Sequence, residues 1–331
     1  MPKILKIGII GGGRIGECHL KAYKFMDNIE VTGVAEIAPE RRRYIEKVYG
    51  VKVFENFEEL LEYSPNIVSV CTPDYFHVEP CIKSAKVGAH ILCEKPLATT
   101  IEDAEKIIDS CKKYGVYLSV GFKFRYEKIY QETYKLLRDE LIGKPLSLYI
   151  ARPQEVSDIM SRWPTQVSVD ISNLCHEIDL AYWFLESEPT YVYAQYNRDW
   201  TKSETPTRVA LLLQHDNNAY SLLYNSIHPE FPHVGGTYDA KFHIIGEKGY
   251  ILGERPNKLE VCINSVPSIH TYNVELKNYY QEAFNREIAA FVKNIRLDRE
   301  PEVKGEDALR TLKVIDAARK SFNMGKKIKI E

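Results

Sequence analysis

The sequence predicts an α/β fold in which an N-terminal, doubly wound parallel sheet is followed by an α+β domain with a large, mainly antiparallel open sheet. Apolar runs of strand length alternate with amphipathic helical patterns over about the first 120 residues, which is typical of βαβ units. After about residue 123 the pattern changes to successive strands in which apolar and polar residues alternate. Such alternation indicates an antiparallel sheet with one face against helices.

The strands expected in the first domain, residues 1–123, are near-continuous apolar runs such as the one from Ile67 to Cys71. Strands that are covered on both faces have this composition. One helix has clear end signals, because Thr100 and Asp103 have the capping-box spacing and Gly115 follows its last residue. The expected strands are 4–10, 30–35, 51–54, 66–71, 89–93 and 116–120, and the expected helices are 14–27, 39–49, 56–63, 76–87 and 100–114.

The second domain, residues 124–331, is expected to bind the substrate and to form oligomer contacts. Its last helix, about 306–323, could pack back on the first domain. No internal repeat and no low-complexity linker interrupts the chain. The expected strands are 146–151, 191–196, 208–213, 219–225, 240–245, 250–253, 259–263 and 269–274, and the expected helices are 126–141, 176–185, 278–296 and 306–323.

A glycine motif, G-x-G-x-x-G at Gly11, Gly13 and Gly16, directly follows the first expected strand. In dinucleotide-binding folds the first glycine allows a tight turn, the second lets the backbone approach a pyrophosphate, and the third lets the helix pack closely on the strand. The N–H groups at the start of the next helix, at Arg14 and Ile15, are expected to bind the pyrophosphate. A glycine-rich turn without a ligand is the alternative, which the flanking strand, helix and acid disfavour.

The choice between NAD and NADP depends on Glu36, which ends the second strand twenty residues after Gly16. A carboxylate there accepts hydrogen bonds from the ribose hydroxyls of the adenosine and repels a 2′-phosphate. However, three arginines follow closely at 41–43, and one of them could reach a 2′-phosphate. We favour NAD over NADP because of the carboxylate.

Composition excludes several classes of function. The chain has 331 residues, enough for two domains, and its formal net charge of −2 indicates no electrostatic attraction to nucleic acid or to anionic membranes. No apolar run reaches transmembrane length, and we expect no signal peptide before the first strand. The seven cysteines contain no C-x-x-C pair. Reduced thiols and a cytoplasmic location are therefore expected.

Two clusters follow the fourth and fifth expected strands, where ligands bind in open α/β sheets. The first contains Cys71, Thr72, Pro73 and His77, and the second is Glu94-Lys95-Pro96. A lysine at this rim would point toward the nicotinamide end of a cofactor, where its charge could stabilise an alkoxide during hydride transfer. The alternative is a solvated lysine at the rim.

A third cluster, from Asp170 to Leu180, opens a helix and contains His176. A histidine in the first turn of a helix can act as a general base for a substrate hydroxyl. Two alternatives are a structural histidine and a metal pair with Asp179, for which no third ligand is evident. A fourth cluster, from Gly121 to Tyr126, ends the first domain and could place a cation at the domain junction.

The motifs occur in a characteristic order: Gly11-x-Gly13-x-x-Gly16, Thr72-Pro73-x-x-x-His77, Glu94-Lys95-Pro96, Gly121-Phe122-x-x-Arg125 and His176-x-x-Asp179. In order and spacing they resemble the Gfo/Idh/MocA family, the relatives of glucose–fructose oxidoreductase and inositol dehydrogenase. The resemblance extends through the segment 243–249 and the closing helix.

This resemblance implies an N-terminal Rossmann domain, a C-terminal α/β domain whose open sheet forms a homodimer or homotetramer face, and NAD(P)-dependent oxidation or reduction of a sugar, cyclitol or related polyol. Lys95 matches the catalytic lysine of the family and His176 its catalytic histidine. The expected cofactor-binding residues are Gly11, Gly13, Arg14, Ile15, Gly16, Glu36, Cys71, Thr72, Pro73, His77, Glu94 and Lys95. The expected substrate-binding residues are Lys95, Arg125, Tyr126, Arg152, Trp163, Asn173 and His176, in a pocket between the domains.

The chain departs from the family at one point. Family members commonly carry an Asp four or three residues before the histidine, and here those positions are Ser172 and Asn173. Asn173 can orient the histidine or the substrate ring but supplies no charge. Asp170 is expected to be out of register. Either a group of the substrate or a downstream acid, Asp179 or Glu177, compensates, or the redox activity is weak or altered.

Three functions are compatible with these residues. The first is an NAD-dependent dehydrogenase or reductase of a sugar or sugar derivative, in which His176 takes the hydroxyl proton and Lys95 stabilises the oxyanion. The second is a glycosidase or epimerase that uses bound NAD for transient oxidation. The third is a regulator that senses NAD or a sugar without catalysis, which the intact Lys95 and His176 disfavour.

Overall fold

The computed structural model describes residues 4–155, 168–197, 206–228, 240–263, 266–271 and 279–331. The chain forms two compact units: residues 1–123 with 281–309, and residues 124–280 with 310–331. The units are therefore discontinuous in sequence, whereas the sequence predicted two uninterrupted segments. Helix α10 (Gly305–Met324) crosses the division, and its residues from Arg310 onward belong to the second unit.

The helix α9 (Tyr279–Arg296) explains why the first unit takes a segment from late in the chain. Its Gln281 donates a hydrogen bond to the carbonyl of Cys18, at 2.9 Å. Its Phe284 packs on the ring of His19, with ring centroids 5.4 Å apart. Its Arg296 donates to the carbonyl of Asp27, at 2.7 Å. Polar and apolar contacts thus attach α9 to the elements at the N-terminus of the chain.

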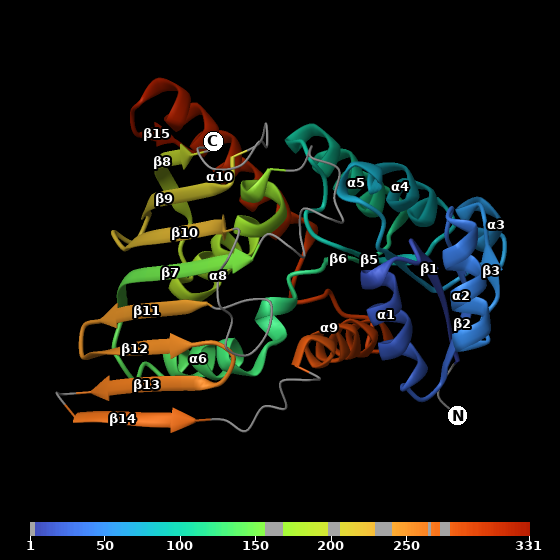
Figure 1. The fold of residues 1–331 in the computed structure, drawn as a ribbon, viewed down its shortest axis with the longest axis horizontal. Coiled ribbons are helices and arrows are strands. Elements are labelled where there is room, and N and C mark those ends of the chain that lie inside the picture. Colours follow the sequence, from blue (N-terminus) through green and yellow to red (C-terminus); the bar gives the residue numbers. More distant parts are fainter. Residues whose placement is uncertain (1–3, 156–167, 198–205, 229–239, 264–265, 272–278) are drawn as a thin grey trace. The chain divides into compact units, whose positions relative to one another are not determined.

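The first unit contains a six-stranded parallel sheet with the order β3-β2-β1-β4-β5-β6 (Figure 1). This is the strand order of dinucleotide-binding folds, whose ligands bind at the carboxyl ends of the strands. The strands are β1 (Leu5–Ile10), β2 (Ile29–Ala35), β3 (Val53–Phe54), β4 (Ile67–Val70), β5 (His90–Cys93) and β6 (Leu118–Val120). The helices before α9 are α1 (Arg14–Lys24), α2 (Pro39–Tyr49), α3 (Phe57–Leu61), α4 (Val78–Lys86) and α5 (Ile101–Tyr114), with a 3₁₀ turn η1 (Asp74–Phe76) before α4.

Sequence signals in this unit are confirmed locally. The four residues of β4 are all buried, as expected of a strand covered on both faces. The hydroxyl of Thr100 accepts a hydrogen bond from the N–H of Asp103, at 3.2 Å, and caps α5. Gly115 ends α5 in the left-handed conformation, with φ +66°.

The second unit contains a nine-stranded sheet with the order β14-β13-β12-β11-β7-β10-β9-β8-β15. Only β7 and β10 pair in parallel; the other neighbours are antiparallel. Helices α6 (Lys128–Arg138) and α8 (Cys175–Leu185) pack on the sheet (Figure 1). The strands are β7 (Pro145–Glu155), β8 (Pro189–Asn197), β9 (Arg208–His215), β10 (Tyr220–His228), β11 (Lys241–Gly246), β12 (Gly249–Glu254), β13 (Lys258–Ile263), β14 (Val266–Thr271) and β15 (Ile328–Lys329).

The predicted fold class is confirmed, and the structure adds elements that the sequence did not reveal. A 3₁₀ segment η2 (Lys123–Tyr126) shortens the start of α6. A π-helical segment η3 (Asp170–Leu174) leads directly into α8. The short strand β15 extends the sheet beside β8. Among the described residues, each helix is too short or too polar to cross a membrane.

Candidate functional site

The glycine loop between β1 and α1 has the geometry that a pyrophosphate requires. Gly11 has φ +96°, and a Cβ there would lie 2.7 Å from the carbonyl carbon of Cys71. A Cβ on Gly16 would lie 1.9 Å from the carbonyl oxygen of Gly11. A Cβ on Gly13 would meet nothing within 4 Å, and Gly13 is the N-cap of α1 without a side-chain cap. The loop therefore leaves the space and the helix N-terminus open for the phosphates of a dinucleotide.

Glu36 is fixed at the end of β2 beside this loop. One carboxylate oxygen accepts a hydrogen bond from the N–H of Gly12, and the other accepts one from the N–H of Ala38, both at 2.8 Å. These bonds hold the carboxylate next to the glycine loop, where a ribose binds in dinucleotide-binding folds. The residues fit NAD, whose adenosine ribose carries a free 2′-hydroxyl and no 2′-phosphate.

The carboxyl end of β5 carries a buried polar chain that ends at Glu94. His19 of α1 contacts Ser69 through Nδ1 and Glu94 through Nε2, both at 3.1 Å, and the hydroxyl of Tyr23 contacts Ser69 at 2.9 Å. Burial opposes the ionisation of Glu94, but His19 and two nearby lysines lower its pKa overall. A Cβ on Gly121 would lie 2.9 Å from the Glu94 carboxyl carbon, so a larger residue after β6 would have to displace this carboxylate. Glu94 is thereby anchored directly before Lys95.

Lys95 lies at the rim of the sheet between two buried neighbours, Glu94 and Pro96, and is itself partly exposed. Its N–H donates to the Glu94 carboxylate at 3.3 Å, and the Lys95–Pro96 peptide bond is cis. The loop after β4 is joined to this segment by His77. The two ring nitrogens of His77 contact the carbonyls of Pro96 and Thr72, each at 2.9 Å. His77 therefore connects the ends of β4 and β5, and its contact with a cofactor stays a prediction.

A second buried carboxyl group, Glu287 of α9, faces the same cluster. Ligand atoms of His19, Glu94 and Glu287 lie within 4.8 Å of one another, and all three residues are buried. Burial, together with the charge of Glu94, raises the pKa of Glu287 well above its usual range, although Lys123 opposes this. The composition is that of a metal site, but the neighbouring ammonium of Lys123 disfavours a further cation. A protonated Glu287 carries no charge, so the cluster does not need a metal ion to neutralise it.

His176 lies at the start of α8, directly after the π-helical segment. π-Helical turns frequently mark functional sites. The ring of His176 stacks on Phe124, with centroids 4.2 Å apart and an interplanar angle of 18°. The guanidinium groups of Arg152 and Arg255 lie over the Phe124 ring, 5.1 Å and 4.7 Å from its centroid. The plane of the imidazole is thus set by an aromatic ring that two cations hold.

The carboxylates near His176 in sequence are each bound by an arginine. Arg152 pairs with Glu177. Arg125 donates to both oxygens of Asp179, with its Nε at 2.9 Å. Arg319 donates to both oxygens of Asp170, at 2.8 and 3.0 Å, and Tyr196 also contacts that carboxylate. The compensating role that the sequence suggested for Glu177 or Asp179 would therefore require breaking a buried ion pair.

Asn173 lies three residues before His176, at a position where the family resemblance led us to expect an acid. Its carbonyl accepts a hydrogen bond from Arg152 at 2.7 Å, which fixes the backbone. Its side-chain Nδ2 is buried, and among the described residues no acceptor contacts it. Such a donor is suited to a hydroxyl group of a ligand.

The other residues predicted to bind the substrate differ in their surroundings, and one of them lies outside the described residues. Arg125, Arg152 and Tyr126 are buried, and both arginines serve internal ion pairs, a role that the sequence did not predict. Trp163 lies outside the described residues. Ser172, the other departure from the family pattern, donates to the carbonyl of Ser168 at 3.1 Å.

His19, Phe124 and Glu287 were not predicted as site residues from the sequence. Each is a residue on the buried side of an element, and Phe124 is indistinguishable in sequence from a core aromatic. His19 and Glu287 are polar residues on otherwise apolar helix faces, beside Cys18 and Ala22 in one case and Phe284 and Phe291 in the other. A buried polar position on an amphipathic helix is the signal that would have indicated them.

Comparison with known proteins agrees with this geometry. A profile described as "Oxidoreductase family, NAD-binding Rossmann fold" matches residues 5–122, and one described as "Oxidoreductase family, C-terminal alpha/beta domain" matches residues 152–330. The chain is 26% identical to a myo-inositol 2-dehydrogenase of Thermotoga maritima over 336 residues, 99% of each chain. It is also 26% identical to an inositol 2-dehydrogenase of Rhizobium meliloti over 346 residues, 98% of this chain and 99% of the relative.

A solved structure has the same fold. The scyllo-inositol dehydrogenase of Lactobacillus casei, with bound NAD(H) and scyllo-inositol, superposes with a TM-score of 0.85 at 22% identity, over 99% of each chain. The glycine loop, Glu36 and the strand order define this protein as an NAD-binding oxidoreductase. The chain belongs to the Gfo/Idh/MocA oxidoreductase family, whose two profiles together span most of its length.

Proposed function

We propose that this protein is a dehydrogenase that uses NAD to oxidise a secondary hydroxyl group of a cyclitol or sugar, or catalyses the reverse reduction. The observation that carries the proposal is the anchored Glu94-Lys95-Pro96 segment at the rim of a sheet whose glycine loop fits a dinucleotide. Sequence relatives that act on inositol support the substrate class. Bound NAD supplies the hydride acceptor, and the protein supplies binding, proton removal and charge stabilisation.

In this proposal Lys95 stabilises the negative charge that develops on the substrate oxygen. The support is its position after β5, with one neighbour, Glu94, held by His19 and the other, Pro96, held by His77. Those contacts restrict the backbone on both sides of Lys95. A preorganised cation acts more strongly on a developing oxyanion than a mobile one does.

His176 is proposed to take the proton of the substrate hydroxyl, and Asn173 to orient the ring through its Nδ2. The support is the stacked, fixed imidazole and the buried donor of Asn173. Glu177 and Asp179 pair with arginines, so their charges are balanced within the protein, and in this proposal they fix α8 and do not assist His176.

The proposal predicts a cofactor and substrate preference. With a panel of inositols, aldoses and nucleotide-linked sugars, we expect reduction of NAD⁺ with at least one inositol or sugar. Activity with NADP⁺ should be at least about tenfold lower than with NAD⁺, because Glu36 repels the 2′-phosphate. Absorbance of the reduced nicotinamide measures both. Product formation without release of NADH would instead indicate transient oxidation, and absence of any turnover across the panel would contradict the proposal.

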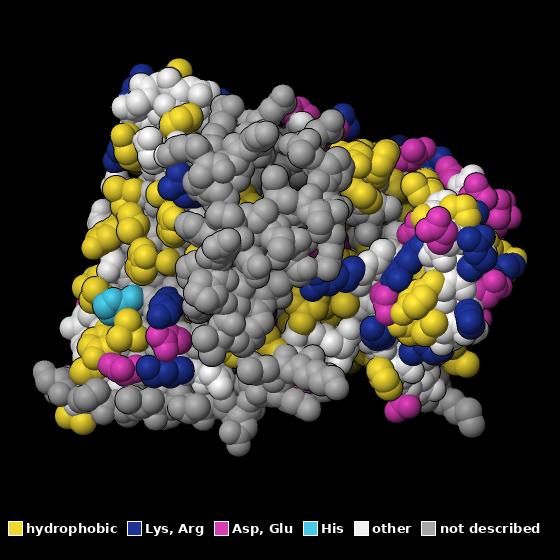
Figure 2. Space-filling model, in the orientation of Figure 1, with side chains coloured by type: hydrophobic (Ala, Val, Ile, Leu, Met, Phe, Trp, Pro, Cys, Tyr) yellow, Lys and Arg dark blue, Asp and Glu magenta, His cyan; other side chains and the backbone are white. Residues whose placement is uncertain are grey.

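We also propose that two or more copies associate through the face of the nine-stranded sheet that bears exposed apolar residues. Tyr193, Leu212, Leu222 and Tyr149 pair directly across β8, β9, β10 and β7. Each is 41–44% exposed. Figure 2 shows hydrophobic side chains gathered over β9 and β10. A continuous apolar row of this kind is typical of an interface.

The double variant L212E/L222E is expected to dissociate the oligomer, because charged groups would replace the centre of this row. Light scattering coupled to size-exclusion chromatography would show the mass of one chain for the variant and a multiple of it for the parent. Val48→Glu, at an exposed apolar residue of α2, is the matched control and should leave the mass unchanged. A parent protein of single-chain mass would refute the interface.

All seven cysteines are buried thiols, which supports the further proposal of a cytoplasmic location.

A further inference from the structure

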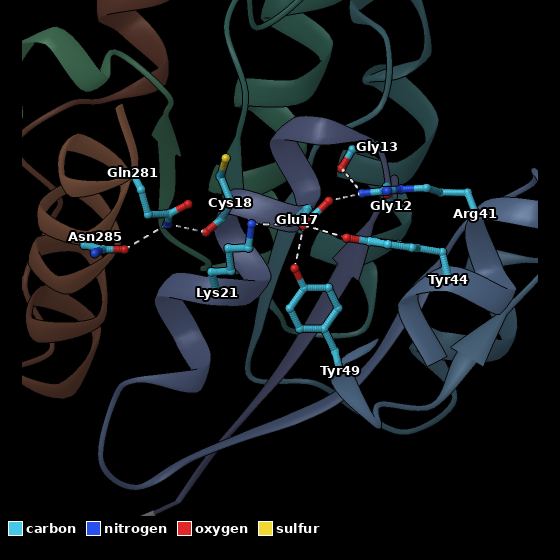
Figure 3. A network of polar contacts seen from close by, with 10 residues as sticks. All are labelled: Gly12, Gly13, Glu17, Cys18, Lys21, Arg41, Tyr44, Tyr49, Gln281 and Asn285. Carbon is cyan, nitrogen blue, oxygen red and sulfur yellow. Dashed lines mark hydrogen bonds and ion pairs between the residues drawn. The ribbon is translucent and has the colours of Figure 1, made fainter. Parts of the chain in front are cut away.

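The arginine that the sequence offered for a 2′-phosphate has another use in the structure. Arg41 lies in the first turn of α2, five residues after Glu36. Its Nε donates to the carbonyl of Gly12 at 2.6 Å, and its Nη2 donates to the carbonyl of Gly13 at 3.4 Å. Figure 3 shows the side chain reaching from α2 to the glycine loop. Arg41 therefore contacts the backbone of the loop that fits the pyrophosphate.

Glu17 holds Arg41 in this position. The Nη2 of Arg41 pairs with the carboxylate of Glu17, the residue that follows the last glycine of the loop. Lys21 pairs with the same carboxylate at 2.9 Å, and the hydroxyls of Tyr49 and Tyr44 also contact it (Figure 3). The guanidinium of Arg41 lies over the ring of Tyr44, 4.6 Å from its centroid. These partners come from α1 and α2, so the network connects the helix that follows the loop with the helix that follows β2.

Glu17 carries its negative charge at physiological pH, so it can pair with Arg41 throughout the neutral range. Burial raises its pKa, but the hydrogen bonds from Tyr49, Arg41 and Lys21 outweigh this and bring the pKa to about 2. The carboxylate is thus ionised throughout the neutral range. A guanidinium already paired with a carboxylate has to leave it before it can form a bidentate contact with a phosphate.

Arg42, the next residue, is retained in the same manner but away from Glu17. It donates to the carbonyls of Glu36 and Ile37, each at 2.9 Å, and pairs with Glu55 at 2.9 Å. Two adjacent arginines of α2 are therefore bound by two different glutamates. Only the Glu17 pair involves an arginine that contacts the glycine loop, and this difference provides a matched control.

We propose that Glu17 is a specificity-determining residue for NAD, because it holds Arg41 on the glycine loop and so withholds the cation that a 2′-phosphate requires. Glu36 excludes the 2′-phosphate by repulsion. Glu17 acts separately, because it keeps the guanidinium of Arg41 from pairing with that phosphate. Glu17 is a positioning residue in this scheme, since it acts through Arg41. This role of Glu17 rests on the proposed use of NAD as cofactor.

The test measures binding, not turnover. In the E36S variant, from which the repulsive carboxylate is removed, the Kd for NADP⁺ serves as the reference by titration calorimetry. The double variant E17Q/E36S is expected to bind NADP⁺ about tenfold more tightly than E36S, or about 1.4 kcal/mol, with little change for NAD⁺. E55Q/E36S releases Arg42 by the same chemical change and should show no such gain. Adding R41A to E17Q/E36S should abolish the gain.

A merely structural role for Glu17 would not shift the ratio of NADP⁺ to NAD⁺ affinity. The proposal is overturned if E17Q/E36S shows the same ratio as E36S, or if the gain survives R41A. E17A/E36S provides a second variant, and retained NAD⁺ binding with an unchanged Tm verifies that each variant is folded. If both Glu17 variants fail to bind NAD⁺, Glu17 is required for the loop itself and the specificity role is refuted.

Discussion

Replacing Lys95 with alanine is expected to lower kcat by about 10³-fold, while the Kd for NAD⁺ changes by less than about threefold. The rate falls because the variant lacks the fixed positive charge of Lys95 beside the substrate oxygen, which becomes negative during hydride transfer. NAD⁺ binding should persist, because the glycine loop and Glu36 are positioned by their own backbone contacts. Steady-state rates and fluorescence titration with NAD⁺ measure the two effects separately.

Two controls sharpen this result. Lys106→Ala removes an exposed lysine that pairs with Asp103 on α5 and should leave kcat unchanged. Small primary amines added to Lys95→Ala should restore part of the rate if the missing group is an ammonium, which a structural defect would not allow. An unaltered kcat in Lys95→Ala would contradict the assigned role.

The sequence predicted this part of the molecule well because its signals are local. The turn at Gly11, the helix start at Gly13 and the acid at the end of β2 all lie within one βαβ unit, where spacing along the chain fixes position in space. The same holds for Lys95, since a residue that follows a parallel strand lies at the carboxyl rim of the sheet.

Other parts of the site depend on partners that are distant in sequence. Glu287 of α9 meets His19 and Glu94, which lie far earlier in the sequence, and Arg319 of α10 meets Asp170. No periodicity along the chain specifies which buried acid meets which arginine. The π-helical segment was also unpredictable, because a change from α to π pairing leaves the apolar pattern of a short segment almost intact. Its effect is to change the register of the residues before His176, so spacing alone could not place Ser172 and Asn173.

Arg255→Met is expected to destabilise the protein by about 3–5 kcal/mol and to lower its Tm by roughly 10 °C. Arg255 donates to both oxygens of Glu127, at 2.7 and 2.6 Å, and the side chains of the pair are only 2% and 1% exposed. Loss of the guanidinium leaves a buried carboxylate with the Tyr279 hydroxyl as its remaining hydrogen-bond donor among these contacts. It also removes the cation that lies over Phe124, on which His176 stacks.

Two control variants test whether the loss of stability comes from leaving one buried charge without its partner. The double variant E127M/R255M removes both charges and should recover most of the stability, since an apolar pair of similar volume avoids the desolvation of two ions. Lys241→Met breaks an exposed pair with Glu254, and exposed pairs contribute less than about 1 kcal/mol. Thermal unfolding monitored by circular dichroism compares the three variants with the parent. If Arg255→Met unfolds at the same temperature as Lys241→Met, the buried pair contributes no more to stability than the exposed one, and the prediction is wrong.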